Sequence, residues 1–135
     1  MKKIIEISII VWSFIANSFS FLMGSIDNLL IMLLIIMAID YLTGICKAIV
    51  NKKLNSIVGV KGLIKKIGYL LIVALAVLID KIMGDAGAIR ILVIYFFIAN
   101  EGISILENWG QMGLPLPNKL KQFFEQLKNE GDKNV

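Results

Sequence analysis

The stretch Leu29–Cys46 reads LLIMLLIIMAIDYLTGIC, and Asp40 is its only charged residue. An apolar run of this length approaches the roughly 20 residues with which an α-helix crosses a bilayer. The whole chain shows the same bias, because 58% of its 135 residues are hydrophobic, 18% are charged and the mean hydropathy is +0.82. A soluble domain has about 45–50% apolar and about 25% charged residues. We therefore predict a small integral membrane protein.

Three further apolar runs accompany this one, so the sequence predicts an all-α integral membrane protein with four transmembrane helices. The helices are expected at about residues 4–23, 29–50, 62–83 and 89–109. Beyond Pro117, apolar residues recur at helical spacing among lysines, which predicts a short C-terminal amphipathic helix at about residues 117–129. No run is left over for a catalytic domain, and we expect a single membrane domain over residues 1–135.

The lysines predict the orientation, because short cytoplasmic loops carry an excess of Lys and Arg. The segment between the second and third runs contains no acidic residue, and its basic residues are Lys47, Lys52, Lys53, Lys61, Lys65 and Lys66. The turn between the first two runs contains no basic residue. We expect the lysine-rich segment in the cytoplasm. Both termini are expected there too, since four crossings return the chain to the side on which it began.

The first run is also open to a second interpretation, as a secretory signal peptide. Lys2 and Lys3 precede it, and Ala16-Asn17-Ser18 resembles a cleavage site. Glu6 lies inside the supposed apolar region and argues against a signal peptide.

Composition removes several classes of chemistry. The chain has no His, and Cys46 is its one cysteine, so a His-based acid–base pair and an intramolecular disulfide are both impossible. We expect no enzymatic activity, no cofactor and no metal, and we expect Cys46 to be a small buried residue. The net charge of +4 does not indicate nucleic acid, because the lysines cluster between apolar runs and not along one amphipathic face.

Polar residues within three of the four runs fall on one helical face each. Such residues are costly in a bilayer, about 2.5–3.5 kcal/mol for a central Asp, so each requires an explanation. The first stripe is Glu6, Ser13, Asn17 and Ser20; the second is Asp40, Thr43, Gly44 and Lys47; the third is Glu101, Ser104 and Asn108, beside Asn100. Two explanations remain open: the stripes pack helix against helix, or they line a water-filled path.

Two clusters of residues carry a family resemblance that extends over most of the chain. The first cluster is Asp40-Tyr41-Leu42-Thr43-Gly44 with Lys47-Ala48, Lys53-Leu54, Ser56, Gly59, Gly62, Lys65 and Lys66. The second is Asn100-Glu101 with Ser104, Glu107, Asn108, Gly113, Pro115 and Pro117, and Asp80-Lys81 lies between them. The sequence resembles the phage lysis and toxin secretion holins, a family that includes a holin-like protein of the clostridial large-toxin locus. The first apolar run matches in character alone.

The resemblance implies a protein of the bacterial cytoplasmic membrane whose partners are the lipid bilayer and further copies of itself. Its homo-oligomers would open non-specific lesions through which a passenger, an endolysin or a large toxin, leaves the cell. It also raises the possibility of a shorter product that starts at Met23. Two other classes remain open, a small proton-coupled transporter that uses Asp40 or Glu101 and a non-conducting scaffold subunit.

Overall fold

The computed structural model describes the backbone of residues 1–133, and their side chains except those of residues 124, 127, 128 and 130–133. The helices are α1 (Lys2–Met23), α2 (Asn28–Val50), α3 (Ser56–Met83), α4 (Ala88–Gln111) and α5 (Asn118–Lys133). The described part of the chain contains no strand. Helices α1 to α4 are each long and apolar enough to cross a membrane. The prediction of an all-helical chain with four candidate spans is therefore confirmed.

The start of α3 differs from the expected boundary near residue 62. Asn55 takes the N-cap position in an extended conformation, and its side chain accepts a hydrogen bond of 2.9 Å from the backbone N–H of Val58. Such a cap satisfies a backbone donor that the first helical turn leaves unpaired, so it fixes the start of the helix at Ser56. The earlier start adds Lys61 to α3, whereas Lys52 and Lys53 remain in the turn before it.

Helices α2, α3 and α4 form a bundle in which α4 makes the larger contacts with both of its neighbours. The centre of this bundle is fully buried and apolar, at Leu30 and Leu33 of α2, Val73 of α3 and Ile94 of α4. Within α2, the buried residues Leu30, Leu33 and Met37 recur at the spacing of one helical face, which explains why a helix apolar almost all round still packs in one register. Many of the other large apolar side chains are exposed, as expected for helices surrounded by lipid.

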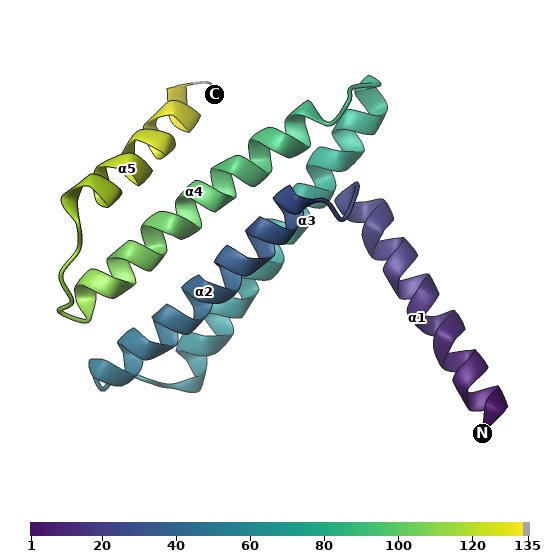
Figure 1. Cartoon of the computed structure of the whole chain (residues 1–135), viewed down its shortest axis with the longest axis horizontal. Coiled ribbons are helices and arrows are strands. Elements are labelled where there is room, and N and C mark those ends of the chain that lie inside the picture. The colour runs from purple at the N-terminus through teal and green to yellow at the C-terminus, as the bar shows by residue number, and fades with distance from the viewer. Residues whose placement is uncertain (134–135) are drawn as a thin grey trace.

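The two ends of the bundle differ in chemistry. The turn between α2 and α3 lies at one end, which we call the lysine-rich end because it carries Lys52 and Lys53. The turns between α1 and α2 and between α3 and α4 lie together at the other end, which we call the Arg90 end (Figure 1).

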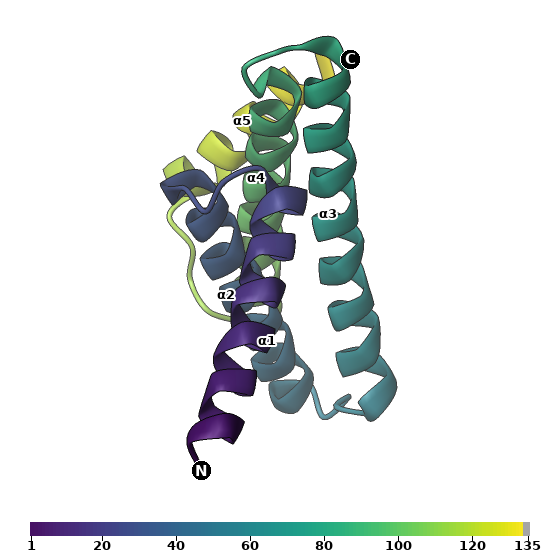
Figure 2. The same cartoon turned by 90° about the vertical axis from the view of Figure 1, so that its right-hand side faces the viewer.

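Helix α1 leaves the bundle at the Arg90 end and diverges from it. Figure 1 shows the N-terminus far from the lysine-rich end, and Figure 2 shows α1 in front of α2, with α3 beside it. The side chains from Met1 to Asn17 are all exposed, and those that meet the bundle begin at Ser18. Its main contact with the bundle is with α3.

Helix α5 folds back beside α4 in the same chain (Figure 1). The turn that reverses the chain contains Gly113 at φ +78 and ends at Pro117, whose carbonyl accepts from Leu120. The amphipathic helix was expected from Leu120, Phe123, Phe124 and Leu127. The side chains of Phe124 and Leu127 lie outside the described residues.

Candidate functional site

A lysine lies between two carboxylates inside the three-helix bundle. The Nζ atom of Lys66 on α3 pairs with Oδ2 of Asp40 on α2 and with Oε2 of Glu101 on α4. Glu101 is 0% exposed, and Asp40 and Lys66 are 7% and 6% exposed. On the other side of Glu101, the Nζ atom of the half-exposed Lys65 lies 3.2 Å from Oε1. We call these four residues the buried charge cluster.

The buried charge cluster is formally neutral, because two carboxylates face two ammonium groups. All three helices of the bundle contribute to it, so separating any two of them removes a partner from a buried charge. Loss of one partner from a buried ion pair costs about 3–5 kcal/mol, since the remaining charge stays out of water. Within a bilayer, ionisable side chains are tolerated where they pair in this way.

Asn108 extends the polar contact between α2 and α4. Its Nδ2 atom donates to Oδ1 of Asp40 and to Oγ1 of Thr43, both at 3.2 Å. A Cβ atom placed on Gly44 would lie 3.7 Å from the same Nδ2 atom, so the glycine lets the two helices come close. The stripes of α2 and α4 therefore face each other, as the packing interpretation requires.

A cavity of about 160 Å³ lies beside the cluster, toward the lysine-rich end. Lys47 and Tyr41 of α2, Gly59 and Gly62 of α3 and Ser104 of α4 are among the residues that line it. Tyr41 lies over the two glycines, because Cβ atoms built there would each approach its ring or hydroxyl to 3.3 Å. The cavity marks where α2 and α3 separate.

Asn100 points away from this cluster toward α3. Its Nδ2 atom donates to the hydroxyl of Tyr69 at 2.7 Å, and the ring of Tyr69 stacks on Phe97 with a centroid distance of 4.0 Å. The Nζ atom of Lys65 lies 5.3 Å from the centre of the Tyr69 ring. Asn100 thus holds α4 against α3, whereas Asn108 holds α4 against α2.

The structure does not bring the stripe of α1 to the buried charge cluster. Glu6, Ser13 and Asn17 are exposed, and Ser20 is half-buried near the Arg90 end. Cys46, expected to be buried, is exposed on the outer face of α2, because the inward positions of this turn are taken by Thr43, Gly44 and Lys47.

The lysines that the sequence grouped together fall into different environments. Lys52, Lys53 and Lys61 are exposed. Lys66 is buried between two carboxylates, a role that the count of basic residues in the loop did not reveal. The signal that points to it is Asp40 and Glu101 themselves, because two acids within apolar helices require a basic partner.

A second polar site, which the sequence pattern did not indicate, lies at the Arg90 end. The side chain of Arg90 is 8% exposed and forms an ion pair of 2.7 Å with Asp27. Its Nε atom donates to the carbonyl of Met23 at 2.6 Å, and its Nη2 atom donates to that of Ser25 at 2.8 Å. This guanidinium lowers the pKa of Asp27, in the turn outside the spans, to about 2. Arg90 thereby joins the end of α1, the following turn and α4 in what we call the Arg90 clasp.

Glycine and aspartate complete the Arg90 clasp. Gly24 has φ +89, and a Cβ atom there would lie 2.9 Å from Nε of Arg90, so this close turn requires glycine. Helix α4 begins after Gly87, which has no side chain with which to cap it. Asp80 of α3 caps it instead, because its carboxylate accepts from the backbone N–H of Ile89 at 3.0 Å and of Arg90 at 2.8 Å.

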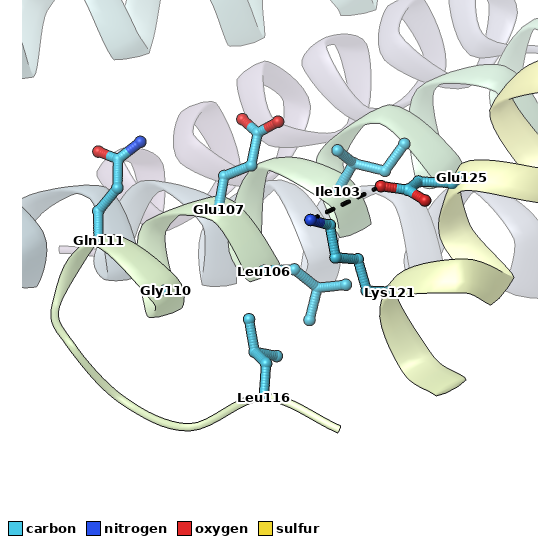
Figure 3. Close-up of a pocket in the computed structure, with 8 residues that line it drawn as sticks. All are labelled: Ile103, Leu106, Glu107, Gly110, Gln111, Leu116, Lys121 and Glu125. Atoms are coloured by element: carbon cyan, nitrogen blue, oxygen red, sulfur yellow. Dashed lines mark ion pairs between the residues drawn. The ribbon is translucent and has the colours of Figure 1, made fainter. Parts of the chain in front are cut away.

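A cavity of about 290 Å³ lies between α4 and α5. Figure 3 shows Ile103, Leu106 and Leu116 around it, with the Lys121–Glu125 ion pair of α5 at its edge. This ion pair spans 3.9 Å between exposed side chains, so it contributes little to stability. The cavity lies where α5 packs on α4. The residues that line it are far in the sequence from Asp40 and Lys66.

The helices and the buried charge cluster describe a multi-pass membrane protein, and comparison with known proteins identifies its class. The bacteriophage holin family matches residues 17–129. The chain belongs to this family, and it is a protein of the bacterial cytoplasmic membrane. The family is not an enzyme family. The matched residues include all of α2, α3 and α4, and thus the whole buried charge cluster.

Individual relatives agree with the family match. An uncharacterized 14.9 kDa protein of Clostridium perfringens is 41% identical over 128 residues, which cover 92% of this chain and 96% of that protein. A probable holin of Bacillus phage phi105 is 33% identical over 116 residues, which cover 86% and 85% of the two chains. No solved structure matches the chain.

Proposed function

We propose that this protein acts as a holin, which assembles into homo-oligomers in the cytoplasmic membrane and opens non-specific lesions large enough for folded proteins. The observation that carries the proposal is the family match over residues 17–129, which contains the buried charge cluster. The passenger is an endolysin, a large toxin or both, and it passes without specific binding.

The buried charge cluster suggests how a closed and an open state differ. In the single chain, Asp40 and Glu101 are neutralised inside the bundle by Lys66 and Lys65. Separating the helices in lipid would leave these charges unpaired, which is costly. In a lesion the same faces meet water, where each charge is solvated without a partner. The polar stripes therefore serve both as packing surfaces in the closed state and as lining in the open state.

The proposed orientation places the lysine-rich end and both termini in the cytoplasm, in accordance with the excess of lysines there. Cysteine labelling tests it, because Cys46 is the natural cysteine and Cys46→Ser provides a cysteine-free chain. A membrane-impermeant thiol reagent added to intact cells should label Ser25→Cys and leave Lys53→Cys unlabelled. The reverse pattern would contradict the orientation.

Induction in a bacterium that carries a cytosolic reporter enzyme tests the function itself. Membrane potential and reporter release are followed together. Where the host has an outer envelope layer that would itself retain the reporter, that layer is removed. A holin is expected to cause abrupt depolarisation followed by escape of the folded reporter. Retention of the reporter, despite verified membrane expression, would contradict the proposal.

One observation favours a second candidate, a small proton-coupled transporter. Carboxylates near the middle of membrane helices serve as proton sites in such proteins, and Asp40 and Glu101 occupy such positions. A transporter would move small cations and retain proteins, and a non-conducting scaffold subunit would do neither.

Variants Asp40→Leu and Glu101→Leu, at verified expression, should change the onset or extent of reporter release. Unchanged release would show that these acids do not matter to the lesion.

A further inference from the structure

We propose that α5 binds the membrane surface at the lysine-rich end, with its apolar face against anionic lipid, and that in a bilayer it does not remain along α4. The inference goes beyond the proposed function, and it requires only that α4 spans the membrane. It begins from the way α5 is seated. Every α5 side chain that the structure describes is exposed, including the apolar Leu120 at 42% and Phe123 at 54%.

The contact between α5 and α4 is loosely packed. The cavity of about 290 Å³ lies between the two helices, and α4 contributes the apolar side chains of Ile103 and Leu106 to its lining. From α5, the lining residues are Lys121 and Glu125, which pair with each other. At the side chains that the structure describes, burial of apolar surface therefore contributes little to holding α5 on α4.

The depth of α5 along α4 conflicts with lipid on this side of the bundle. Ile103 precedes the end of α4 at Gln111 by eight residues, or about 12 Å, and the exposed Lys121 and Glu125 lie beside it around the same cavity (Figure 3). Helix α4 is about 36 Å long and the hydrocarbon core is about 30 Å thick, so this position lies within the core. Exposed charges at this depth would face hydrocarbon, which is costly.

On the membrane surface, the same helix satisfies both kinds of side chain. Leu120 and Phe123 share one face, and the sequence continues their helical spacing with two further apolar residues. Lys119 and Lys121 flank this face, because each lies about 100° around the helix from Leu120, on opposite sides. The apolar side chains can therefore enter the acyl chains while the lysines reach the phosphate groups.

The charge of this end favours anionic lipid. Over the length of α5, four lysines outnumber three acids. Lys52 and Lys53 are exposed in the turn between α2 and α3, at the same end of the bundle, and add to the positive charge. Basic residues next to a membrane span are attracted to anionic headgroups. We therefore expect α5 to bind an anionic surface more strongly than a neutral one.

The turn before α5 lies where this position requires it. Trp109 is two residues from the end of α4, and its Nε1 atom donates to the carbonyl of Pro115 at 3.2 Å, which holds the turn beside that end. Tryptophan is enriched at the boundary between lipid and water. Gly113 has φ +78, and a Cβ atom there would meet nothing within 4 Å, so rotation at this glycine redirects α5 without a clash.

Fluorescence quenching in vesicles tests the position of α5 in the intact chain. In the Cys46→Ser background, Gln122→Cys or Asn129→Cys carries a fluorophore, and a nitroxide in the middle of the lipid acyl chains quenches it. Along α4, residue 129 would lie about 10 Å deeper than residue 122 and would be quenched several-fold more. On the surface, both positions lie at one depth and should be quenched equally and weakly. Stronger quenching at residue 129 would overturn the proposal.

Contact between the apolar face and lipid is measured at Leu120→Cys, with the nitroxide placed just below the headgroups. Quenching should be several-fold greater than at the matched control Gln122→Cys, which lies on the opposite face of α5. Membrane insertion of each variant is verified by resistance to alkaline extraction. Equal quenching would mean that α5 lies in water or that another copy of the chain covers its apolar face, and either result would overturn the proposal.

The lipid itself is tested by comparing two kinds of vesicle. One contains equal parts of phosphatidylcholine and phosphatidylglycerol, and the other contains phosphatidylcholine alone. Quenching at Leu120→Cys should be greater in the anionic vesicles. Each lysine should change the ratio of bound to unbound α5 roughly fivefold, so Lys119→Gln with Lys121→Gln should remove most of the difference. Lys2→Gln with Lys3→Gln, in exposed residues of α1, should leave it unchanged. Equal quenching in both kinds of vesicle would overturn the assignment to anionic lipid.

Discussion

The substitution Lys66→Met removes the central positive charge of the buried charge cluster while keeping a long side chain in its place. Asp40 and Glu101 then remain buried without the ammonium group that now contacts both. Stranding part of a buried ion pair costs about 3–5 kcal/mol. We therefore expect the ratio of folded to unfolded protein to fall roughly 10²- to 10⁴-fold.

Unfolding of the purified protein in mixed micelles, titrated with a denaturing detergent and followed by helical circular dichroism, measures this loss. The matched control is Lys61→Met, which removes an exposed lysine from the same helix and should change stability little. Adding Asp40→Asn and Glu101→Gln to Lys66→Met should recover part of the loss, because no buried charge is then left unpaired. If Lys66→Met unfolded at the same detergent fraction as the control, the buried charge cluster would not stabilise the bundle.

Three further predictions concern the Arg90 end. Gly24→Ala introduces a Cβ atom 2.9 Å from Nε of Arg90 at φ +89, so it should lower stability by about 1–3 kcal/mol and increase cleavage of the turn by added protease. Asp80→Ala leaves the first N–H groups of α4 without their acceptor and should cost about 1–2 kcal/mol, measured as a lower thermal midpoint; an unchanged midpoint would mean that this cap is not needed. The ion pair with Arg90 lowers the pKa of Asp27 from 3.8 to about 2, so its contribution is complete above about pH 4 and is lost as the pH falls toward 2. Asp27→Asn should abolish that part of the acid dependence of the thermal midpoint, and an identical pH profile in the variant would contradict it.

The candidate spans were predictable from the sequence because bilayer-length apolar runs have few other uses. The same argument did not predict where α3 begins, since that depends on one capping hydrogen bond from Asn55. Nor did it predict that α5 returns along α4, because an amphipathic helix has the same pattern on a lipid surface and on a protein surface.

The two acids of the candidate site could be predicted from the sequence, but its buried lysine could not. Asp40 and Glu101 were conspicuous as charges within apolar runs, whereas Lys66 was one of several lysines near a loop. Its separate role depends on how α3 packs against α2 and α4, which turns Lys66 inward and leaves its neighbour Lys65 half-exposed. Arg90 was missed for a similar reason, because its partners come from a turn more than sixty positions away in the sequence.

A holin of this kind should, without any other protein, open passages wide enough for folded proteins. This can be tested by efflux from liposomes that contain the purified protein, with a small dye and a folded fluorescent protein trapped together. Both are expected to leave the same vesicles. Loss of the dye with full retention of the fluorescent protein, or retention of both with the protein correctly inserted, would contradict it.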